Sequence, residues 1–323
     1  MTEHNHPMRR FQLAGEASAD AALAALSQEQ TSAEAVPGVQ EAVAAAVAAA
    51  DLDAPDGPPA QAPLNPRVAA FFDIDNTMMR GASIFHLARG AYAQKLLSRG
   101  DLIGFAVDQL KFLAQGTEDM DVMVEATEAA LSFAKGRTVE EIVELGEDIY
   151  DQGIESKIWP GTLTLAQKHL AAGERVWLVS ATPVELARVV AGRLGFTGAM
   201  GTVSEIRDGV YTGRLVGHPL HGAAKAEALR ALASREGLDL SQCYAYSDSN
   251  NDLPMLTVVG RPVAVNPDAQ LRQAAIENRW PIYDFRARRL WVRYKLPALI
   301  TGAAAAGIAV GAAGATIAAR SSR

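Results

Sequence analysis

Residues 71–79 read FFDIDNTMM, an apolar run that ends in two carboxylates two positions apart. Because side chains alternate between the two faces of a strand, Asp73 and Asp75 are expected to point to the same side. Two negative charges held this close together disfavour each other's ionisation unless an opposite charge compensates them. The pattern therefore predicts a cation beside the end of this strand.

Net charge and cysteine content limit the partners of the chain. The 323 residues carry a net charge of -7, and residues 67–285 remain acidic once the basic C-terminal stretch is set aside. An acidic body has no electrostatic attraction for a phosphate backbone, so nucleic acid is not expected as a partner. The single cysteine, Cys243, excludes an internal disulfide and is expected to be a core residue because it lies in an apolar run.

From residue 68 onward, short apolar runs alternate with helical stretches, which predicts an α/β fold built on a doubly wound parallel sheet. The expected strands are residues 68–72, 175–179, 242–246 and 262–265. Sheets of this kind bind their ligands outside the carboxyl ends of the strands. Asp73, Ser180 and Asp248 stand at such ends and are therefore expected to converge on one site.

The chain is expected to divide into four parts. These are a disordered acidic tail at 1–66, a catalytic core at 67–80 and 160–285, a helical cap at 81–159, and a basic juxtamembrane segment with a transmembrane helix at 286–323. The tail is rich in Ala and Pro and ends in a solvated linker. Its Ala-rich run at 40–50 favours a helix but has no evident packing partner.

Two local patterns predict structure around this core. Thr138 is followed three residues later by Glu141, the spacing of a capping box, so a helix is expected to start there. That helix belongs to the cap, and caps exclude water and select substrates. Asp208-Gly209 lies between two alternating segments, which predicts a β-hairpin with a tight turn.

The first strand end carries residues suited to attack on phosphorus. A carboxylate nucleophile forms an aspartyl-phosphate and divides hydrolysis into two easier displacements, and Asp73 is the candidate. Asp75 is the candidate general acid and base, which protonates the leaving oxygen and later deprotonates water. Thr77 and the amides of this turn are candidate donors to the phosphate oxygens.

The other strand ends supply candidates to bind phosphate and metal. Ser180 and the Ala181 amide, with Pro183 expected at the first helical position, form a phosphate cradle at a helix N-terminus. Lys225 supplies positive charge against the developing phosphoryl charge. Asp248 completes an oxygen site for Mg²⁺ together with Asp73 and the Asp75 carbonyl, since Mg²⁺ takes a few carboxylates and keeps several waters.

Four segments, DIDNT, VSAT, AKAEAL and YSDSNNDLPML, resemble in sequence and order the motifs of the haloacid dehalogenase (HAD) superfamily. The resemblance is to its phosphoserine-phosphatase-like branch, subfamily IB, and implies an HAD-like core, a helical cap and a Mg²⁺-dependent phosphatase. By this resemblance Asp73 is the nucleophile and Asp75 the general acid and base. The resemblance further implies phosphate ligands at Ser180, Lys225 and Asn251, a Mg²⁺ ligand at Asp248, and a supporting role for Asp252.

The departures from this branch concern the substrate. Phosphoserine phosphatases of this branch carry an acidic residue shortly after the first motif and an arginine in the cap, which read the amine and the carboxylate of serine. Here Arg80, Gly81 and Ala82 stand where the acid is sought, and the segment LSFAK has no arginine before Lys135. Both readers of serine are missing from the expected positions.

The C-terminal segment predicts a membrane anchor. Residues 296–319 contain 24 residues without a charge, and at about 1.5 Å per residue they span about 36 Å, enough to cross the hydrocarbon layer. The alternative is an Ala-rich helix that packs on protein. Gly307 and Gly311 form a G-x-x-x-G pattern that would let two such helices pair in a homodimer. Five basic residues precede the segment and two follow it, which predicts a single-pass protein of the cell membrane with its catalytic domain in the cytoplasm.

Three hypotheses of function follow. The leading one is a Mg²⁺-dependent phosphomonoester hydrolase, tethered to the membrane, whose substrate is a phosphorylated lipid or another small phosphomonoester. The second is a phosphoserine phosphatase with altered serine readers. The third, from another class, is a catalytically idle membrane-bound interaction protein, against which the intact set of crowded carboxylates argues.

Overall fold

A computed structural model describes residues 37–52, 65–97, 100, 124, 127–129 and 131–286 of the chain. Among them no helix is long and apolar enough to cross a membrane. The expected anchor at 296–319, with Gly307 and Gly311, lies outside the described residues and stays a prediction.

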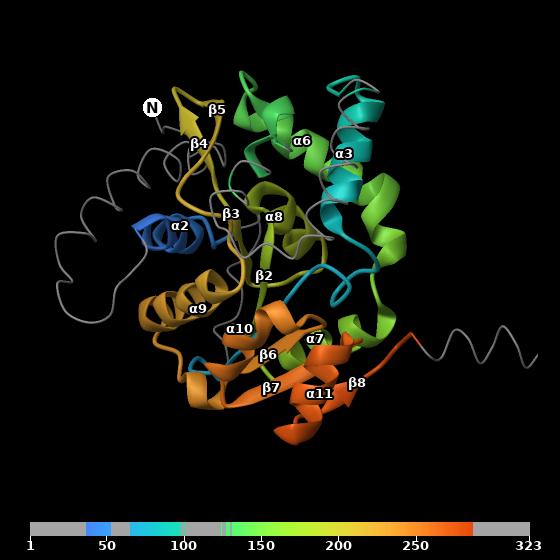
Figure 1. The fold of residues 1–323 in the computed structure, drawn as a ribbon, viewed down its shortest axis with the longest axis vertical. Helices are drawn as coiled ribbons and strands as arrows, with labels where there is room; N and C mark the ends of the chain where they lie inside the picture. Colours follow the sequence, from blue (N-terminus) through green and yellow to red (C-terminus); the bar gives the residue numbers. More distant parts are fainter. Residues whose placement is uncertain are drawn as a thin grey trace, which may run out of the picture. The chain divides into compact units, whose positions relative to one another are not determined.

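A six-stranded parallel sheet forms the centre of the fold (Figure 1). Its strand order is β3-β2-β1-β6-β7-β8, so the first strand of the chain lies between β2 and β6. The strands are β1 (Ala69–Phe72), β2 (Arg175–Pro183), β3 (Gly198–Thr202), β6 (Tyr244–Ser247), β7 (Arg261–Val265) and β8 (Ile282–Tyr283). Every pair of neighbouring strands is parallel, which confirms the predicted α/β class.

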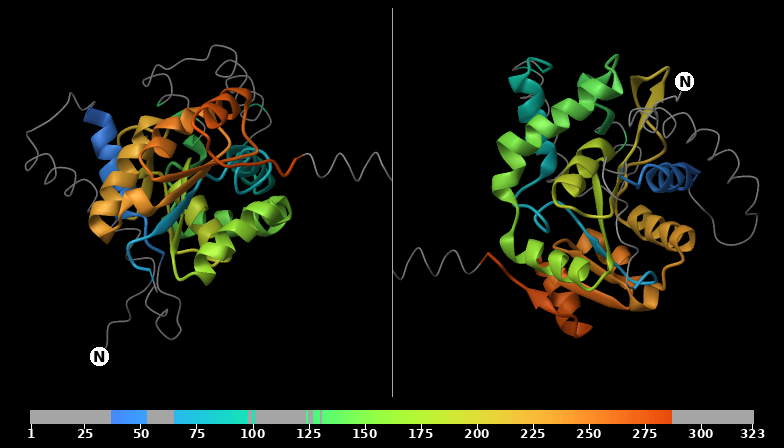
Figure 2. Two further views of the ribbon diagram at one scale, coloured as in Figure 1. Left: turned by 90° about the horizontal axis from the view of Figure 1, so that it is seen from below. Right: turned by 180° about the vertical axis from the view of Figure 1, so that it is seen from behind.

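Helices cover both faces of this sheet (Figure 2). Successive side chains of a strand point to opposite faces, and accordingly Phe71 joins the core under α9 (Ala223–Glu236) and α10 (Leu253–Thr257). Phe72 faces the other way, toward His169 of α7 (Pro160–Ala171). Two further helices are α8 (Val184–Arg193) and α11 (Ala269–Glu277), and two short turns are η4 (Leu240–Gln242) and η5 (Asn250–Asp252).

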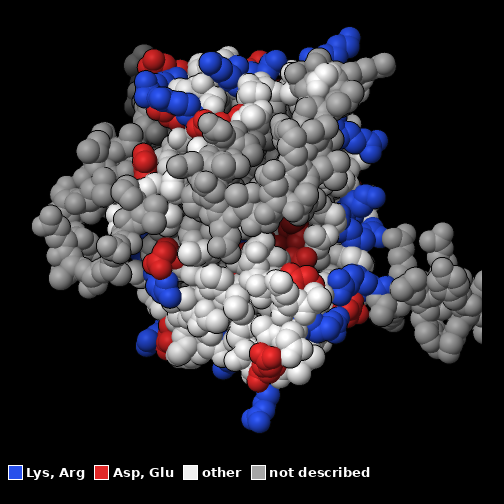
Figure 3. All heavy atoms as spheres, in the orientation of Figure 1, with Lys and Arg blue, Asp and Glu red and all other residues white. Residues whose placement is uncertain are grey.

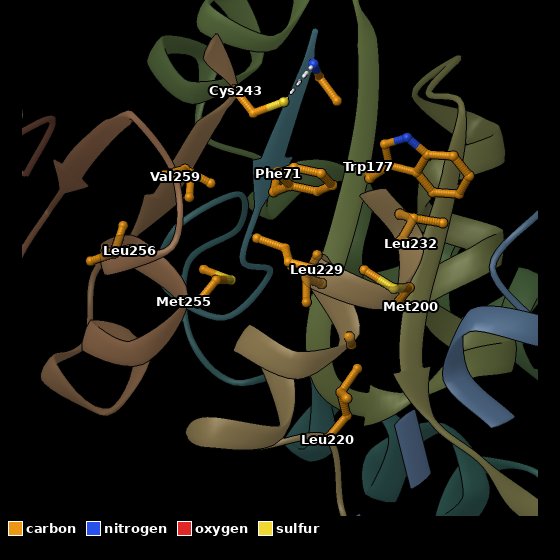
Figure 4. Packing of buried hydrophobic residues seen from close by; sticks show 14 of the residues in the cluster. Phe71, Trp177, Met200, Leu220, Leu229, Leu232, Cys243, Met255, Leu256 and Val259 are labelled. Carbon is orange, nitrogen blue, oxygen red and sulfur yellow. Dashed lines mark hydrogen bonds between the residues drawn. The ribbon is translucent and has the colours of Figure 1, made fainter. Parts of the chain in front are cut away.

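A hydrophobic core cluster fills the space between the sheet and α9 (Figure 4). Phe71 and Trp177 lie side by side on the neighbouring strands β1 and β2 and pack against Leu229. Cys243 is fully buried in the same cluster, where its sulfur accepts the Ala69 amide at 3.3 Å. The prediction that Cys243 is a core residue is confirmed.

The described elements between β1 and β2 are all helical. They are α3 (Ser83–Ala93), η1 (Ser132–Ala134), α6 (Val139–Ile149), η2 (Tyr150–Ile154) and η3 (Glu155–Lys157), followed by α7. The capping box is confirmed, because the Thr138 hydroxyl accepts the Glu141 amide and the Glu141 carboxylate accepts the Thr138 amide. Helix α6 packs against α3 and against α8 of the core.

The predicted hairpin is also confirmed. Strands β4 (Ser204–Arg207) and β5 (Val210–Leu215) pair in antiparallel fashion around Asp208 and Gly209. Both turn residues have positive φ, 51° and 76°, as the tight hairpin turn requires.

The expectation of a disordered tail through residue 66 is wrong for residues 37–52. Helix α2 (Pro37–Ala48) packs on α9 and on β3 through alanines that are almost fully buried, among them Ala46. After the helix, the Ala50 carbonyl accepts the Ala199 amide at 2.9 Å. The Ala-rich run therefore has a packing partner, the edge strand of the sheet, which no local pattern reveals.

Some strand boundaries also differ from the prediction. Strand β2 continues to Pro183, which is the N-cap residue of α8 and not its first helical residue. Strands β3 and β8 were not predicted. The sequence of β3, GAMGT, contains small residues without alternation, and β8 has only two residues.

Candidate active site

The ends of β1 and β6 bring the first and fourth motifs together. Phe72 pairs with Tyr246, and the Asp73 amide continues the ladder by donating to the Tyr246 carbonyl at 3.0 Å. Asp73 is buried, and Asp248 follows two residues after Tyr246. Parallel neighbours end at the same edge of a sheet, so both carboxylates lie at this edge.

Lys225 connects the two motifs. It lies in the first turn of α9, and its Nζ is 2.7 Å from Asp73 Oδ1 and 2.9 Å from Asp252 Oδ2. Burial lowers the pKa of Lys225, but the charges of Asp252 and Asp73 outweigh burial and raise the pKa above its ordinary value. The buried ammonium therefore stays charged and holds both carboxylates.

The site is crowded with acidic groups. Burial raises the pKa of Asp73 well above its ordinary value; Lys225 lowers it, while Asp252, Asp248 and Asp75 raise it further. Burial and the Asp252 charge raise the pKa of Asp248 to about 7. One lysine thus faces four carboxylates, and the described site carries an excess of negative charge.

Asp75 is held by the first helix of the inserted segment. Its Oδ1 accepts the Ser83 amide at 2.8 Å, which satisfies a free N–H at the start of α3. Burial raises the pKa of Asp75, and the hydrogen bonds from Ser83 oppose this effect. A carboxyl group with a raised pKa is suited to donate a proton near neutral pH.

The oxygen atoms at the ends of β1 and β6 are the candidate ligands for Mg²⁺. The described residues contain no group of three or more His, Cys, Asp or Glu side chains arranged to hold a metal ion. The expected set uses two carboxylates, Asp73 and Asp248, and the Asp75 carbonyl, which are the oxygen donors that Mg²⁺ prefers. Because the Asp248 charge raises the pKa of Asp73, a shared cation would relieve their repulsion. These residues fit Mg²⁺.

The end of β2 supplies a hydroxyl network. Ser180 is buried, and its Oγ lies 2.8 Å from Thr182 Oγ1 and accepts the Thr182 amide at 3.2 Å. Thr182 in turn lies 2.5 Å from Ser83 Oγ, which links the second motif to α3. Ala181 is exposed, and its carbonyl accepts the Thr202 hydroxyl. The sequence prediction missed Ser83 and Thr182, because only the fold brings them together.

Thr77 and Asn251 occupy different surroundings. Thr77 is fully buried, and its hydroxyl donates to Asp248 Oδ1 at 3.3 Å, so here it faces the expected metal ligand. Asn251 is exposed on η5, and its amide donates to Ser249 Oγ at 3.2 Å. Asp252 is buried and accepts the Ser247 hydroxyl at 2.7 Å in addition to Lys225. The two motifs at β1 and β6 are therefore joined by Thr77 as well as by Lys225.

Arg80 occupies the position at which the phosphoserine phosphatases of this branch carry an acidic residue that binds the substrate amine. Its guanidinium lies 5.4 Å from the centre of the Trp159 ring, and its Nη2 donates to the Ser156 carbonyl at 2.6 Å. The described part of this segment therefore offers a fixed cation and no carboxylate at that position.

Comparison with known proteins identifies the family. The profile of the haloacid dehalogenase-like hydrolase family matches residues 70–257, more than half of the chain. The chain belongs to this family. Within the HAD family it is similar to phosphoserine phosphatase SerB1 of Mycobacterium tuberculosis, with 49% identity over 84% of this chain and 87% of the relative.

Two further matches extend the comparison. Histidinol-phosphatase of Neisseria meningitidis is 33% identical over 67% of this chain and 98% of the relative. A crystal structure from Bordetella pertussis, described as a protein with unknown function, matches with a TM-score of 0.62 and 28% identity, covering 68% and 98% of the two chains. The predictions of a phosphoserine-phosphatase-like HAD hydrolase and of a phosphomonoester hydrolase are confirmed.

Proposed function

We propose that this HAD hydrolase is a Mg²⁺-dependent phosphatase that acts through an aspartyl-phosphate on Asp73. The observation that carries the proposal is the buried contact of Lys225 with Asp73 and Asp252 at the end of the central strand. A charged lysine beside a carboxylate holds that carboxylate ready and attracts a phosphate dianion. Asp75 follows on the same turn, where its raised pKa suits proton transfer.

The first step is a displacement at phosphorus. An Asp73 carboxylate oxygen forms a bond to phosphorus while the bond from phosphorus to the ester oxygen breaks. Asp75 gives its proton to the departing oxygen, so the alcohol leaves neutral. Lys225 stabilises the charge that collects on the phosphoryl oxygens.

The second step reverses the protonation. Asp75, now a carboxylate, takes a proton from a water molecule whose oxygen attacks the phosphorus of the acyl phosphate. The bond between phosphorus and the Asp73 oxygen breaks, and phosphate and the free carboxylate result. Asp73, Asp248 and the Asp75 carbonyl would hold Mg²⁺, which when bound would neutralise charge on the phosphate oxygens.

The proposed substrate is a small phosphomonoester. The relatives are named for different alcohols, serine and histidinol, so the family position alone does not select one. The name of the M. tuberculosis relative favours phosphoserine, while Arg80 at the place of the amine reader favours a substrate without an amine there. A phosphorylated lipid is the third candidate and depends on the proposed anchor.

A substrate panel tests the proposal directly. The full chain with Mg²⁺ is given phosphoserine, histidinol phosphate, a sugar phosphate and a lysophosphatidate, and phosphate release is compared with that of Asp73→Asn. Turnover of at least one ester that vanishes in the variant supports the proposal. No turnover of any phosphoester would favour the idle interaction protein instead.

The intermediate has its own test. With p-nitrophenyl phosphate, whose leaving group needs no proton, the Asp75→Asn variant can complete the first step but lacks the base for the second. It should therefore accumulate phosphate on the peptide that contains Asp73, as seen by mass spectrometry after an acid quench. Phosphate found on another residue would refute the role of Asp73 while leaving the phosphatase class intact.

The membrane tether is part of the proposal and rests on the sequence of residues 296–319. The basic residues that precede it would be attracted to an anionic leaflet by about 1 kcal/mol each. Cells that express the full chain, or a chain ending at Asp284, are fractionated and their membranes washed with carbonate. Full-length protein that is stripped by the wash would contradict the anchor.

A further inference from the structure

The turn that follows β7 makes hydrogen bonds to the loop after β1 and to the loop after β6, although it belongs to none of the four motifs. This turn, residues 266–268, lies next to the end of β6 because β6 and β7 pair in parallel. Asn266 is fully buried and has a φ of 49°, a left-handed conformation that asparagine tolerates better than most residues. Its amide donates to the Tyr283 carbonyl of β8 at 2.7 Å, which fixes the turn to the sheet.

The side chain of Asn266 holds the loop after β1. Its Nδ2 donates to the Asn76 carbonyl at 3.0 Å. Asn76 also has positive φ, and its Oδ1 accepts the Gly81 amide at 3.1 Å, which closes the loop on itself. This loop carries Asp73 and Asp75, so Asn266 fixes the backbone immediately beyond the first motif.

Asp268 holds the loop after β6. Its amide donates to the Asp248 carbonyl at 2.8 Å, and its Oδ2 accepts the Asn250 amide at 2.8 Å. The other oxygen, Oδ1, accepts the Leu271 amide at 2.7 Å and caps α11. The loop with Asp248 is thereby fastened to the start of a helix.

The two loops carry the carboxylates of the proposed metal site, so the separation of these loops has to be fixed. The side-chain bond that joins them directly, from Thr77 to Asp248, is long, at 3.3 Å. We propose that turn 266–268 positions Asp73 and Asp248 for a shared Mg²⁺ ion, with Asn266 and Asp268 as positioning residues that touch neither metal nor substrate. The inference rests on the proposed function, since it concerns the metal site assigned there.

The test of Asn266 separates its hydrogen bond from its backbone conformation. Asn266→Gly keeps the left-handed backbone at little steric cost but removes the donor to Asn76. Mg²⁺ binding to the full chain, without substrate, is measured by titration calorimetry. We expect the Mg²⁺ dissociation constant to rise about 10- to 100-fold, the effect typical of partners that orient metal ligands, while kcat at saturating Mg²⁺ falls much less. The matched control is Asn278→Ala, which removes a similar bond to the Ala274 carbonyl at 2.9 Å, remote from the site.

Asp268 is tested against another aspartate that caps a helix. Asp268→Ala removes the carboxylate that accepts the Asn250 and Leu271 amides. Asp239→Ala removes the carboxylate that accepts the Ser241 amide and caps η4. We expect Asp268→Ala to weaken Mg²⁺ binding and Asp239→Ala to leave it unchanged, at comparable losses of thermal stability. Asn266→Asp, which keeps the size but cannot donate, should weaken Mg²⁺ binding as Asn266→Gly does.

The outcomes distinguish this inference from the proposed function. If the unmodified chain binds Mg²⁺ and the Asn266 and Asp268 variants bind it equally well, the positioning role is refuted and the phosphatase assignment stands. If these variants lose only thermal stability, as the controls do, turn 266–268 is merely structural. If the unmodified chain binds no Mg²⁺, the proposed metal site and this inference are both refuted.

Discussion

Asp248→Asn should stabilise the metal-free protein, although it removes a residue of the proposed site. The pKa of Asp248 is raised from 3.8 to about 7, first by burial and then by the Asp252 charge. A difference of one pKa unit is worth about 1.4 kcal/mol, so keeping Asp248 ionised costs the fold about 4 kcal/mol. Because the residue is partly exposed, solvent screening reduces this figure, and we expect about 2 to 4 kcal/mol. Asparagine still accepts the hydrogen bond from Thr77.

The pH dependence gives the sign of the effect. Below about pH 4, Asp248 is protonated in both the folded and the unfolded chain, and the variant should gain nothing. Between pH 4 and about 7 the folded chain binds more protons than the unfolded chain, so the unmodified protein loses stability as pH rises. The gain of the variant should therefore grow over this range and level off above pH 7.

Urea unfolding in EDTA, at pH 5 and pH 8, measures the free energy of unfolding of the unmodified full chain and of Asp248→Asn. The control is Asp239→Asn, which should lower the stability at pH 8 where Asp248→Asn raises it. Hydrogen bonds from Ser241 and Gln242 lower the pKa of Asp239, so the ionised carboxylate stabilises the fold at high pH. With Mg²⁺ at about 100 times its dissociation constant, the unmodified protein should gain about 2.7 kcal/mol that the Asp248 variant lacks. A variant that is less stable than the unmodified chain at pH 8 in EDTA would refute the crowding of carboxylates at this site.

Three further predictions concern turnover and packing. Asp73→Asn should abolish turnover with the fold intact by circular dichroism, whereas Asp75→Asn should slow it by about 10² to 10⁴-fold because only proton transfer is lost; equal small losses would contradict the two roles. Lys225→Met should cost about 3 to 5 kcal/mol in chemical unfolding, since it leaves buried carboxylates without their cation, and unchanged stability would refute the pairing. Ala46→Glu buries a charge between α2 and α9 and should lower the unfolding midpoint, while Ala48→Glu on the exposed side of the same helix should not; equal midpoints would mean that α2 does not pack as described.

Side chains of both charges lie on the visible described surface in one view of the molecule. On the face shown in Figure 3, basic and acidic side chains of the described residues are interspersed. The attraction for a phosphate group would then come from Lys225 and from a bound cation, both at the strand ends, and the expectation that nucleic acid is not a partner stays a prediction.

The sequence by itself determined the features that depend on neighbouring residues. The strand β1 with Asp73, the capping box at Thr138 and the hairpin at Asp208 each follow from a pattern within a few positions, since caps and turns are set by local hydrogen bonds and backbone angles. The alternation of strands and helices was sufficient to predict a parallel sheet. Parallel strands end at a common edge, so the convergence of Asp73 and Asp248 was also predictable.

Only the tertiary structure decided which distant segments meet. Helix α2 was expected to lack a partner, yet it covers β3, a strand of small residues that carries no periodic signal of its own. The contact of Ser83 with Thr182 and the reach of Asn266 to Asn76 join residues about 100 and 190 positions apart. Neither pair has a spacing that a local pattern could encode, because such bonds arise only when the sheet brings its loops to one edge. The sequence was therefore sufficient to identify the candidate groups for the chemistry, and the fold determined what holds them in place.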